Sequence, residues 1–462
     1  MYAKNTWSKY KDNQYKDVMD FNEGYKHYIS AGKTERACVK ESIALATAKG
    51  FKDINEYSSL KTGDKVYVVN KDKNIALFVM GEKPLTEGMR ILGAHIDSPR
   101  LDLKQNPLYE SDGFAMMDTH YYGGVKKYQW VTIPLSLYGV VVKKDGTVVD
   151  VMIGEDENDP VVGVTDLLIH LSADQLQKTA AKVIEGENLD LNVGSIPLDD
   201  EEKETVKRNI LKLLQEKYDI EEEDFLSAEI EVVPTGKARD FGIDRSMVMG
   251  YGHDDRVCAY TSLMAILDID TPEYTSCCIL VDKEEIGSVG ATGAQSLFFE
   301  NTIAELLHLC GDDNYLSLKR AMTNSKMLSS DVSAGFDPLY KEVNDAKNAA
   351  YLGNGICFNK YTGSRGKSGS NDANPEYMAE LRKIMDEAQI HFQTAELGKV
   401  DQGGGGTIAY ILGNYNMNVI DAGIAVLNMH APYEIVSKVD VYEGYLAYKV
   451  FLQKLKIKTY SI

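Results

Sequence analysis

The sequence lacks the features that mark membrane-spanning, secreted and nucleic-acid-binding proteins. It has no run of about 18 apolar residues, the length needed for a membrane-spanning helix, and its first residues contain no apolar core typical of a secretory signal. Lys and Arg number only 50 against 70 Asp and Glu, a formal net charge of −20, and they form no long basic patch. Such a surface repels phosphate and anionic lipid. We therefore expect no nucleic-acid partner, no membrane partner and a cytoplasmic location.

Cysteine is also scarce. Six cysteines in 462 residues, with no CxxC spacing, exclude a disulfide framework and argue against a thiolate metal site. Cys277 and Cys278 lie inside an apolar run and are predicted to be buried. The glycine run at 403–406 lacks the spacing of phosphate-binding loops. We expect this run to line a substrate cleft with its backbone instead.

Apolar runs separated by turn signals indicate an α/β fold. The segments 75–80, 91–96 and 277–281 are continuously apolar, which is typical of strands buried on both faces of a helix-covered sheet. Helical patterns lie between such runs, and Thr34 is in position to cap one of them. The pattern predicts an α/β fold with a helix-covered mixed sheet.

A middle segment, 101–243, has a different pattern. A strand over 132–142, an Asp-Gly turn and a returning strand predict a β-hairpin. The segment 229–233 alternates between polar and apolar residues, as a half-exposed strand does. We therefore expect 1–100 and 244–462 to form one α/β domain, interrupted by an inserted, largely β domain at 101–243.

Imidazoles and carboxylates occur where predicted strands end. His95 and Asp97 lie at the end of one apolar run, and strand alternation directs both side chains to the same side. Glu284 and Glu285 follow another run, and there alternation points the two carboxylates in different directions. One of them can bind a metal while the other acts as a general base. A histidine satisfied in a turn and a solvated acidic loop are the ordinary alternatives.

Three more segments place metal-ligand residue types in similar positions. They contain Asp254 with Asp255, then Asp331, and finally His430. Alone, none is informative, because an Asp-Asp-Arg sequence is most often a salt-bridged turn. Together, two imidazoles and three or four carboxylates are the ligand set of two zinc-like ions about 3.5–4 Å apart, bridged by an aspartate.

These motifs resemble those of the aspartyl aminopeptidase and vacuolar aminopeptidase I family of cocatalytic zinc metallopeptidases. The matching segments are Ala94–Pro99, Asp254–Arg256, Asp282–Ser288, Ser330–Asp331 and Met429–His430. The resemblance covers essentially the whole chain. It implies a zinc-exopeptidase fold in which the first and last segments form the catalytic domain and the insertion serves oligomerisation.

The resemblance also implies a set of metal ligands. His95 and Asp331 are expected to hold one ion, and Glu285 and His430 the other. Asp254 is expected to bridge the two ions. The implied cofactors are two divalent metal ions per subunit, with Zn2+ expected and Co2+ or Mn2+ also suited to nitrogen and oxygen ligands.

Three further residues receive catalytic roles from the resemblance. Asp97 is expected to orient the imidazole of His95. Glu284 is expected to be the general base for a water molecule that bridges the metals. His170, in the insertion, is expected to stabilise the oxyanion, often in a neighbouring subunit's site. A buried histidine on a strand is the alternative interpretation of His170.

The implied activity is hydrolysis of the N-terminal peptide bond of peptides with a free N-terminus. The family's assembly implies a homo-oligomer, specifically a dodecamer. A deacylase or carboxypeptidase of the same fold is one alternative, and a non-catalytic assembly protein is another. Every metal and base position is filled here by a competent residue, which favours an enzyme.

The preferred N-terminal residue of the substrate stays open. Residues 253–255 read His-Asp-Asp, where eukaryotic acid-specific members of the family read Leu-Asp-Asn. Lys360, Arg365 and Lys367 lie in the segment expected to line the specificity pocket, and each could pair with an acidic side chain or lie on the surface. We expect a bacterial-type member with broader, apolar-leaning specificity.

Overall fold

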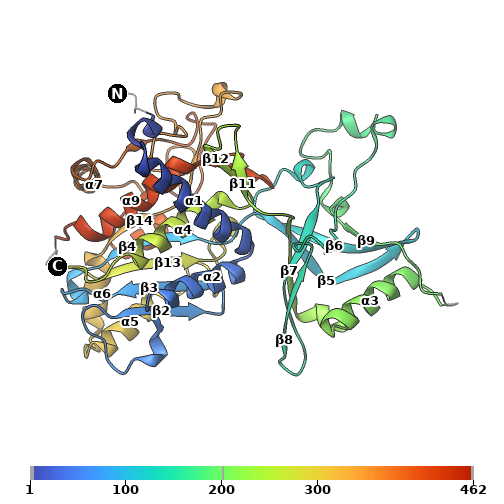
Figure 1. The fold of residues 1–462 in the computed structure, drawn as a ribbon, viewed down its shortest axis with the longest axis horizontal. Helices are drawn as coiled ribbons and strands as arrows, with labels where there is room; N and C mark the ends of the chain where they lie inside the picture. Colours follow the sequence, from blue (N-terminus) through green and yellow to red (C-terminus); the bar gives the residue numbers. More distant parts are fainter. Residues whose placement is uncertain (1–4, 200–201, 459–462) are drawn as a thin grey trace. The chain divides into compact units, whose positions relative to one another are not determined.

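The computed structural model describes residues 5–199 and 202–458. The chain divides into two compact units (Figure 1). The first unit runs to Asp97 and continues with Ala238–Met429 and the chain from Glu434 onward; the second unit contains Ser98–Lys237 and His430–Tyr433. The start of the sequence through Lys4, where no secretory signal is expected, lies outside the described residues.

A mixed sheet of nine strands forms the centre of the first unit. In spatial order its strands are β1 (Lys52–Asp53), β2 (Lys65–Asn70), β3 (Asn74–Val79), β13 (Ser276–Val281), β4 (Arg90–His95), β14 (Lys326–Ser329), β18 (Asn418–Gly423), β16 (Ile356–Asn359) and β17 (Phe392–Thr394). β13 pairs in parallel with β4, which pairs in parallel with β14. The continuous apolar runs of the sequence are thus central strands, as predicted.

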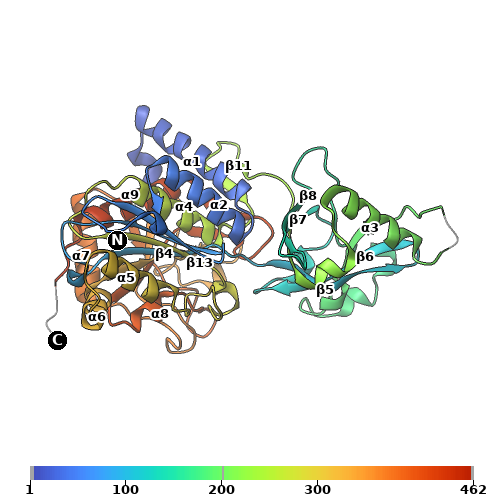
Figure 2. The same ribbon diagram turned by 90° about the horizontal axis from the view of Figure 1, so that it is seen from below.

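Helices cover both faces of this sheet (Figure 2). On one face lie α1 (Asn13–Ala31), α2 (Glu35–Ala48), α4 (His253–Leu267), α7 (Pro375–Glu387) and α9 (Lys438–Lys454), and on the other lie α5 (Phe298–Leu309), α6 (Tyr315–Asn324) and α8 (Ala409–Gly413). Successive side chains of β3 point to opposite faces of the sheet. Leu77 packs with the first set of helices and Phe78 with the second. Within the described chain, no helix combines the length and apolar character needed to cross a bilayer.

A smaller sheet of five strands completes the first unit. Its strands, in spatial order, are β11 (Arg239–Phe241), β12 (Met247–Gly250), β20 (Glu434–Ser437), β19 (Ala425–Leu427) and β15 (Ser333–Ala334). β12 leads through a short turn into α4, and β20 leads directly into α9. This arrangement places the start of α4 next to the start of β20, because Gly250 pairs with Glu434.

The second unit is built on an antiparallel sheet of six strands. In spatial order they are β8 (Val148–Ile153), β7 (Leu135–Val142), β10 (Ala228–Pro234), β5 (Arg100–Ser111), β6 (Phe114–Tyr122) and β9 (Leu191–Gly194), and α3 (Thr205–Tyr218) packs against β5, β6 and β9. The predicted hairpin joins β7 and β8. Its first strand begins at Leu135 instead of Thr132, which has a φ of 62° and cannot continue a strand. The α/β fold with a largely β second part is confirmed.

Candidate functional site

Three neighbouring strands bring candidate residues to one edge of the large sheet. His95 ends β4, and Asp331 lies just beyond the end of β14. Glu284 and Glu285 begin the short 3-10 helix η9 (Glu284–Ile286), which follows β13. Since β13, β4 and β14 are parallel neighbours, their carboxyl ends meet at the same edge, where open α/β sheets bind ligands.

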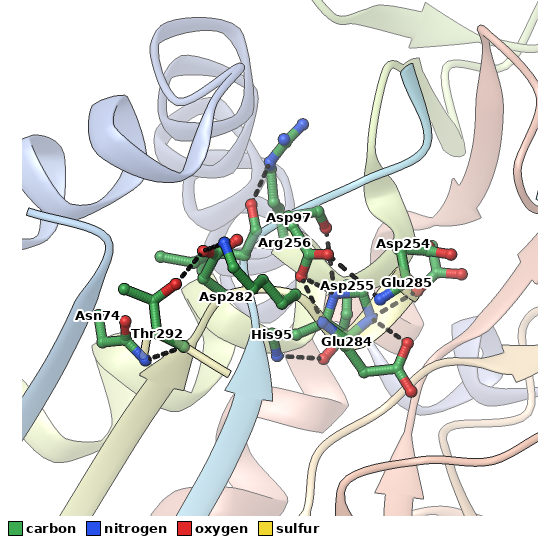
Figure 3. A network of polar contacts seen from close by, with 12 residues as sticks. Asn74, His95, Asp97, Asp254, Asp255, Arg256, Asp282, Glu284, Glu285 and Thr292 are labelled. Atoms are coloured by element: carbon green, nitrogen blue, oxygen red, sulfur yellow. Dashed lines mark hydrogen bonds and ion pairs between the residues drawn. The ribbon is translucent and has the colours of Figure 1, made fainter. Parts of the chain in front are cut away.

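The start of α4 contributes Asp254. Gly252 before it has a φ of 76°, and Asp254 itself has a ψ of 107°, outside the helical range. The carboxylate of Asp254 therefore turns toward the sheet edge. Its Oδ1 atom lies 3.1 Å from Nε2 of His95 (Figure 3).

The side chains form two overlapping groups with the spacing of metal ligands. His95, Glu284 and Asp331 make one group, and His95, Asp254 and Glu285 make the other. In each group one ligand atom per residue lies within 4.8 Å of the others. We refer to these five residues together as the carboxylate cluster. Its members come from positions 95 to 331 of the sequence and meet as predicted; their individual roles stay predictions.

The electrostatics of the carboxylate cluster suit a cation. Burial and the nearby carboxylates of Asp255 and Glu284 raise the pKa of Asp331 well above its usual range. Burial opposes the protonation of His95, but the carboxylates of Asp254 and Asp97 outweigh this effect and raise its pKa. Both shifts report an excess of negative charge in a desolvated site. Zn2+ binds imidazole and carboxylate ligands of this kind, so the residues present fit the metal.

Asp97 contacts both His95 and the backbone of η9. Its Oδ1 atom lies 3.2 Å from Nδ1 of His95. The same carboxylate accepts hydrogen bonds from the backbone N–H groups of Glu284, at 3.1 Å, and Glu285, at 3.2 Å. The contact with His95 is the one expected from the resemblance. The hydrogen bonds between Asp97 and the backbone of η9 were not predicted, because residue types in a sequence do not indicate which backbone groups a carboxylate will bind.

The two remaining predicted histidines belong to the second unit. His430 has its Nδ1 atom 3.0 Å from the carbonyl oxygen of Gly124. Its role as a metal ligand stays a prediction. His170 lies on the 3-10 helix η5 (Ile169–Leu171) and is exposed. The alternative of a buried strand histidine is therefore wrong for His170.

Two buried carboxylates beside the site are not among the predicted metal ligands, although Asp255 belongs to one of the candidate segments. Asp255 accepts a hydrogen bond from the backbone N–H of His95 at 3.3 Å. Glu434, at the start of β20, accepts one from the backbone N–H of Asp254 at 2.9 Å. The available signal for Glu434 was a carboxylate opening an apolar strand soon after His430. Glu434 precedes its apolar strand, whereas His95 and Glu284 stand at the carboxyl ends of theirs.

Two of the three cations in the expected specificity segment already have an anionic partner within the chain. Lys360 and Lys367 both form ion pairs with Asp372, and the lysine side chains are 43% and 42% exposed. This pairing reduces the positive charge that these lysines present.

Comparisons with known proteins align over nearly the whole chain. The aminopeptidase I zinc metalloprotease family (M18) matches residues 28–452. A probable M18 family aminopeptidase 1 of Clostridium acetobutylicum is 62% identical over 97% of this chain and 98% of its own length. The corresponding protein of Thermotoga maritima is 45% identical over 98% of this chain and 100% of its own length.

Solved structures show the same fold. The crystal structure of an M18-family aminopeptidase from Thermotoga maritima superimposes with a TM-score of 0.95 at 45% identity, over 98% of this chain and 100% of that one. That of aminopeptidase I from Clostridium acetobutylicum gives 0.91 at 59% identity, with the same coverage of 98% and 100%. The chain therefore belongs to the aminopeptidase I family of zinc metalloproteases, peptidase family M18, and is a metalloaminopeptidase.

Proposed function

We propose that the carboxylate cluster and His430 together hold two zinc ions and that the enzyme removes the N-terminal residue from peptides with a free N-terminus. The observation that carries this proposal is the pair of overlapping ligand groups, which share His95 and differ in their carboxylates. One ion at His95 and Asp331, a second at Glu285 and His430, and Asp254 between them form the assignment that we propose. Co2+ and Mn2+ suit the same donors.

We assign the general base to Glu284. Its side chain is 17% exposed, whereas those of His95 and Asp254 are 2% and 5% exposed. The carboxylate of Glu284 can thus reach solvent and substrate while remaining near the cluster, with Oε2 3.9 Å from Nε2 of His95. Bound zinc supplies polarisation of the scissile carbonyl and a lowered pKa of water. Glu284 takes a proton from the attacking water and returns it to the leaving amine.

We propose that the second unit mediates assembly into a homo-oligomer, with a dodecamer as the expected form. Support comes from an exposed apolar segment in and around η5. Leu168, Ile169 and Leu171 are 53%, 67% and 67% exposed, and apolar groups exposed together in this way are typical of a protein interface. His170 lies within this segment, so assembly would bury it against another subunit, where we propose that it stabilises the oxyanion.

The test is a substrate panel with purified protein of defined zinc content. We expect turnover of aminoacyl p-nitroanilides and of peptides with a free α-amino group. N-acetylated peptides and substrates that report C-terminal cleavage should not be turned over. Turnover of these last two classes would instead support a deacylase or a carboxypeptidase, and no turnover of any substrate by the zinc-loaded protein would support a non-catalytic assembly role. Parallel reconstitution with Co2+ and Mn2+ identifies the metals that support activity.

A further inference from the structure

A buried glutamate outside the carboxylate cluster binds the backbone of one of its members. Glu434 is 1% exposed and opens β20, directly across from Gly250 of β12. Its Oε2 atom accepts a hydrogen bond from the backbone N–H of Asp254 at 2.9 Å. Asp254 and Glu434 thus meet although they lie 180 positions apart in the sequence.

The N–H group of Asp254 requires such an acceptor. It lies in the first turn of α4, where backbone N–H groups have no acceptor within the helix. Asp254 is only 4% exposed, so water cannot readily replace that acceptor, and a buried N–H group that lacks a partner is costly. The hydrogen bond to Glu434 therefore fixes the backbone from which the Asp254 carboxylate extends toward His95.

The segment that Glu434 holds lies beside a buried pair of aromatic side chains. The hydroxyl group of Tyr25, on α1, and Nδ1 of His253, the residue before Asp254, form a hydrogen bond. Burial and the charge of Glu434 raise the pKa of Tyr25. Both rings are buried, so the chain next to Asp254 is closely packed.

We infer that Glu434 is a positioning residue of the metal centre: it holds the backbone of Asp254 so that the Asp254 carboxylate is placed for metal binding. The inference rests on the proposed function, since it assumes that Asp254 is a metal ligand. Groups that orient metal ligands typically contribute 10–100-fold to metal affinity or activity, through geometry and not through direct contact. A simple helix cap would contribute to stability alone.

Two substitutions separate position from charge. Glu434→Gln keeps the length of the side chain and an oxygen that can accept the N–H of Asp254, but removes the charge. Glu434→Asp keeps the charge but withdraws the carboxylate by one carbon–carbon bond, about 1.5 Å. We expect Glu434→Asp to weaken zinc binding by about 10–100-fold, with a matching loss of kcat, and Glu434→Gln to bind zinc as the wild type does.

The zinc dissociation constant is measured by competition with a chromophoric chelator, and the fold is checked by circular dichroism. Glu443 on α9 is the matched control, because it is buried and accepts the backbone N–H of His391 at 2.9 Å. Glu443→Asp should lower the unfolding temperature and leave zinc affinity unchanged.

Wild-type zinc affinity in a folded Glu434→Asp variant would overturn the inference. So would a loss in Glu434→Gln as large as that in Glu434→Asp, because Glu434→Gln keeps an acceptor in place and the position of that acceptor would then not explain zinc binding. Should the Asp variant fail to fold, Glu434→Met takes its place, because Met is close to Glu in length but cannot accept the N–H of Asp254 well; wild-type zinc affinity in that variant would overturn the inference. Tight zinc binding without peptide hydrolysis by the wild type would refute the proposed function but leave this affinity test valid.

Discussion

The Oδ2 atom of Asp97 accepts a hydrogen bond from the backbone N–H of Glu285 at 3.2 Å. Its Oδ1 atom does the same for Glu284 and also approaches the ring of His95. One carboxylate therefore links the end of β4 to the 3-10 helix that follows β13. Movement of η9 relative to His95 would break these contacts, so Asp97 fixes the spacing between the imidazole and the two glutamates.

Asp97→Asn should weaken zinc binding and activity together, by about 10–100-fold. The two backbone N–H groups of η9 bind different oxygens of Asp97, and the Asn side chain has only one acceptor oxygen. The variant therefore loses one of the two hydrogen bonds to η9. Asp440→Asn is the control: Asp440 also accepts two backbone N–H groups, from Gly353 at 2.6 Å and Gly355 at 2.7 Å. The control should lose stability but keep its zinc affinity. Equal effects of the two variants on zinc affinity would contradict a specific role for Asp97.

Glu284→Gln should retain zinc and lose activity. The amide cannot accept the proton of the attacking water, and general-base catalysis contributes about 10²–10⁴-fold. The measurements are kcat with an aminoacyl p-nitroanilide and zinc content by elemental analysis of the same sample. Activity close to that of the wild type, at equal zinc content, would remove Glu284 from the role of base. A variant that loses zinc would identify Glu284 as a ligand instead.

The layered fold could be predicted from the sequence because burial on both faces leaves a clear pattern. Strands β3, β4 and β13 each read as unbroken apolar runs, and all three are fully buried. The cap of α2 was visible too, and Thr34 does accept the N–H of Ala37 at 3.2 Å. Strand order was not visible, because nothing within the run of β13 indicates that it pairs with β3 in one direction and β4 in the other.

The site was predictable only as a set of residue types at strand ends. Their convergence depends on the order β13-β4-β14, which the local patterns did not indicate; the resemblance implied the ligand set without it. Glu434 escaped prediction because its partner is a backbone N–H group, present at every residue except proline and thus without a sequence signature. Side chains that bind side chains are easier to predict than those that bind a distant backbone.

Removal of metal should lower the thermal stability of the enzyme. We expect two zinc ions per chain by elemental analysis of the zinc-loaded protein. A ligand that binds only the folded state stabilises it by about 4 kcal/mol at 1,000 times its dissociation constant, so the unfolding temperature should fall in chelator and recover with added zinc. Scanning calorimetry across a series of zinc buffers measures the effect. An unfolding temperature that does not change with free zinc would contradict a metal centre in the carboxylate cluster.

Charge placed in the exposed apolar segment of η5 should disrupt assembly. Ile169→Asp and Leu171→Asp would each bury a carboxylate in the proposed interface, at a cost of several kcal/mol. Sedimentation should show a dodecamer for the wild type and smaller species for both variants. Leu226→Asp is the control, since Leu226 in the same unit is 58% exposed and lies outside η5. A wild type that sediments as a monomer at all concentrations would refute the proposed assembly.

Asp421 should make the stability of the fold depend on pH. Burial raises the pKa of Asp421 from 3.8 to about 6, an effect that the nearby hydroxyl groups of Thr407 and Ser329 only partly offset. Between these two pH values the folded protein holds a proton that the unfolded chain releases. The stabilisation from Asp421 is therefore fully present below pH 3.8 and is lost as the pH rises through 6.

The expected loss is about 3 kcal/mol, since each unit of pKa shift corresponds to about 1.4 kcal/mol. Asp421→Asn removes the titrating group while keeping its size. The unfolding free energy of the wild type, minus that of the variant, should thus decrease by most of this amount between pH 4 and pH 7. Denaturant titrations of both proteins in chelator, which removes the contribution of bound metal, give this difference. Parallel curves over the whole range would show that Asp421 is ionised in the folded state.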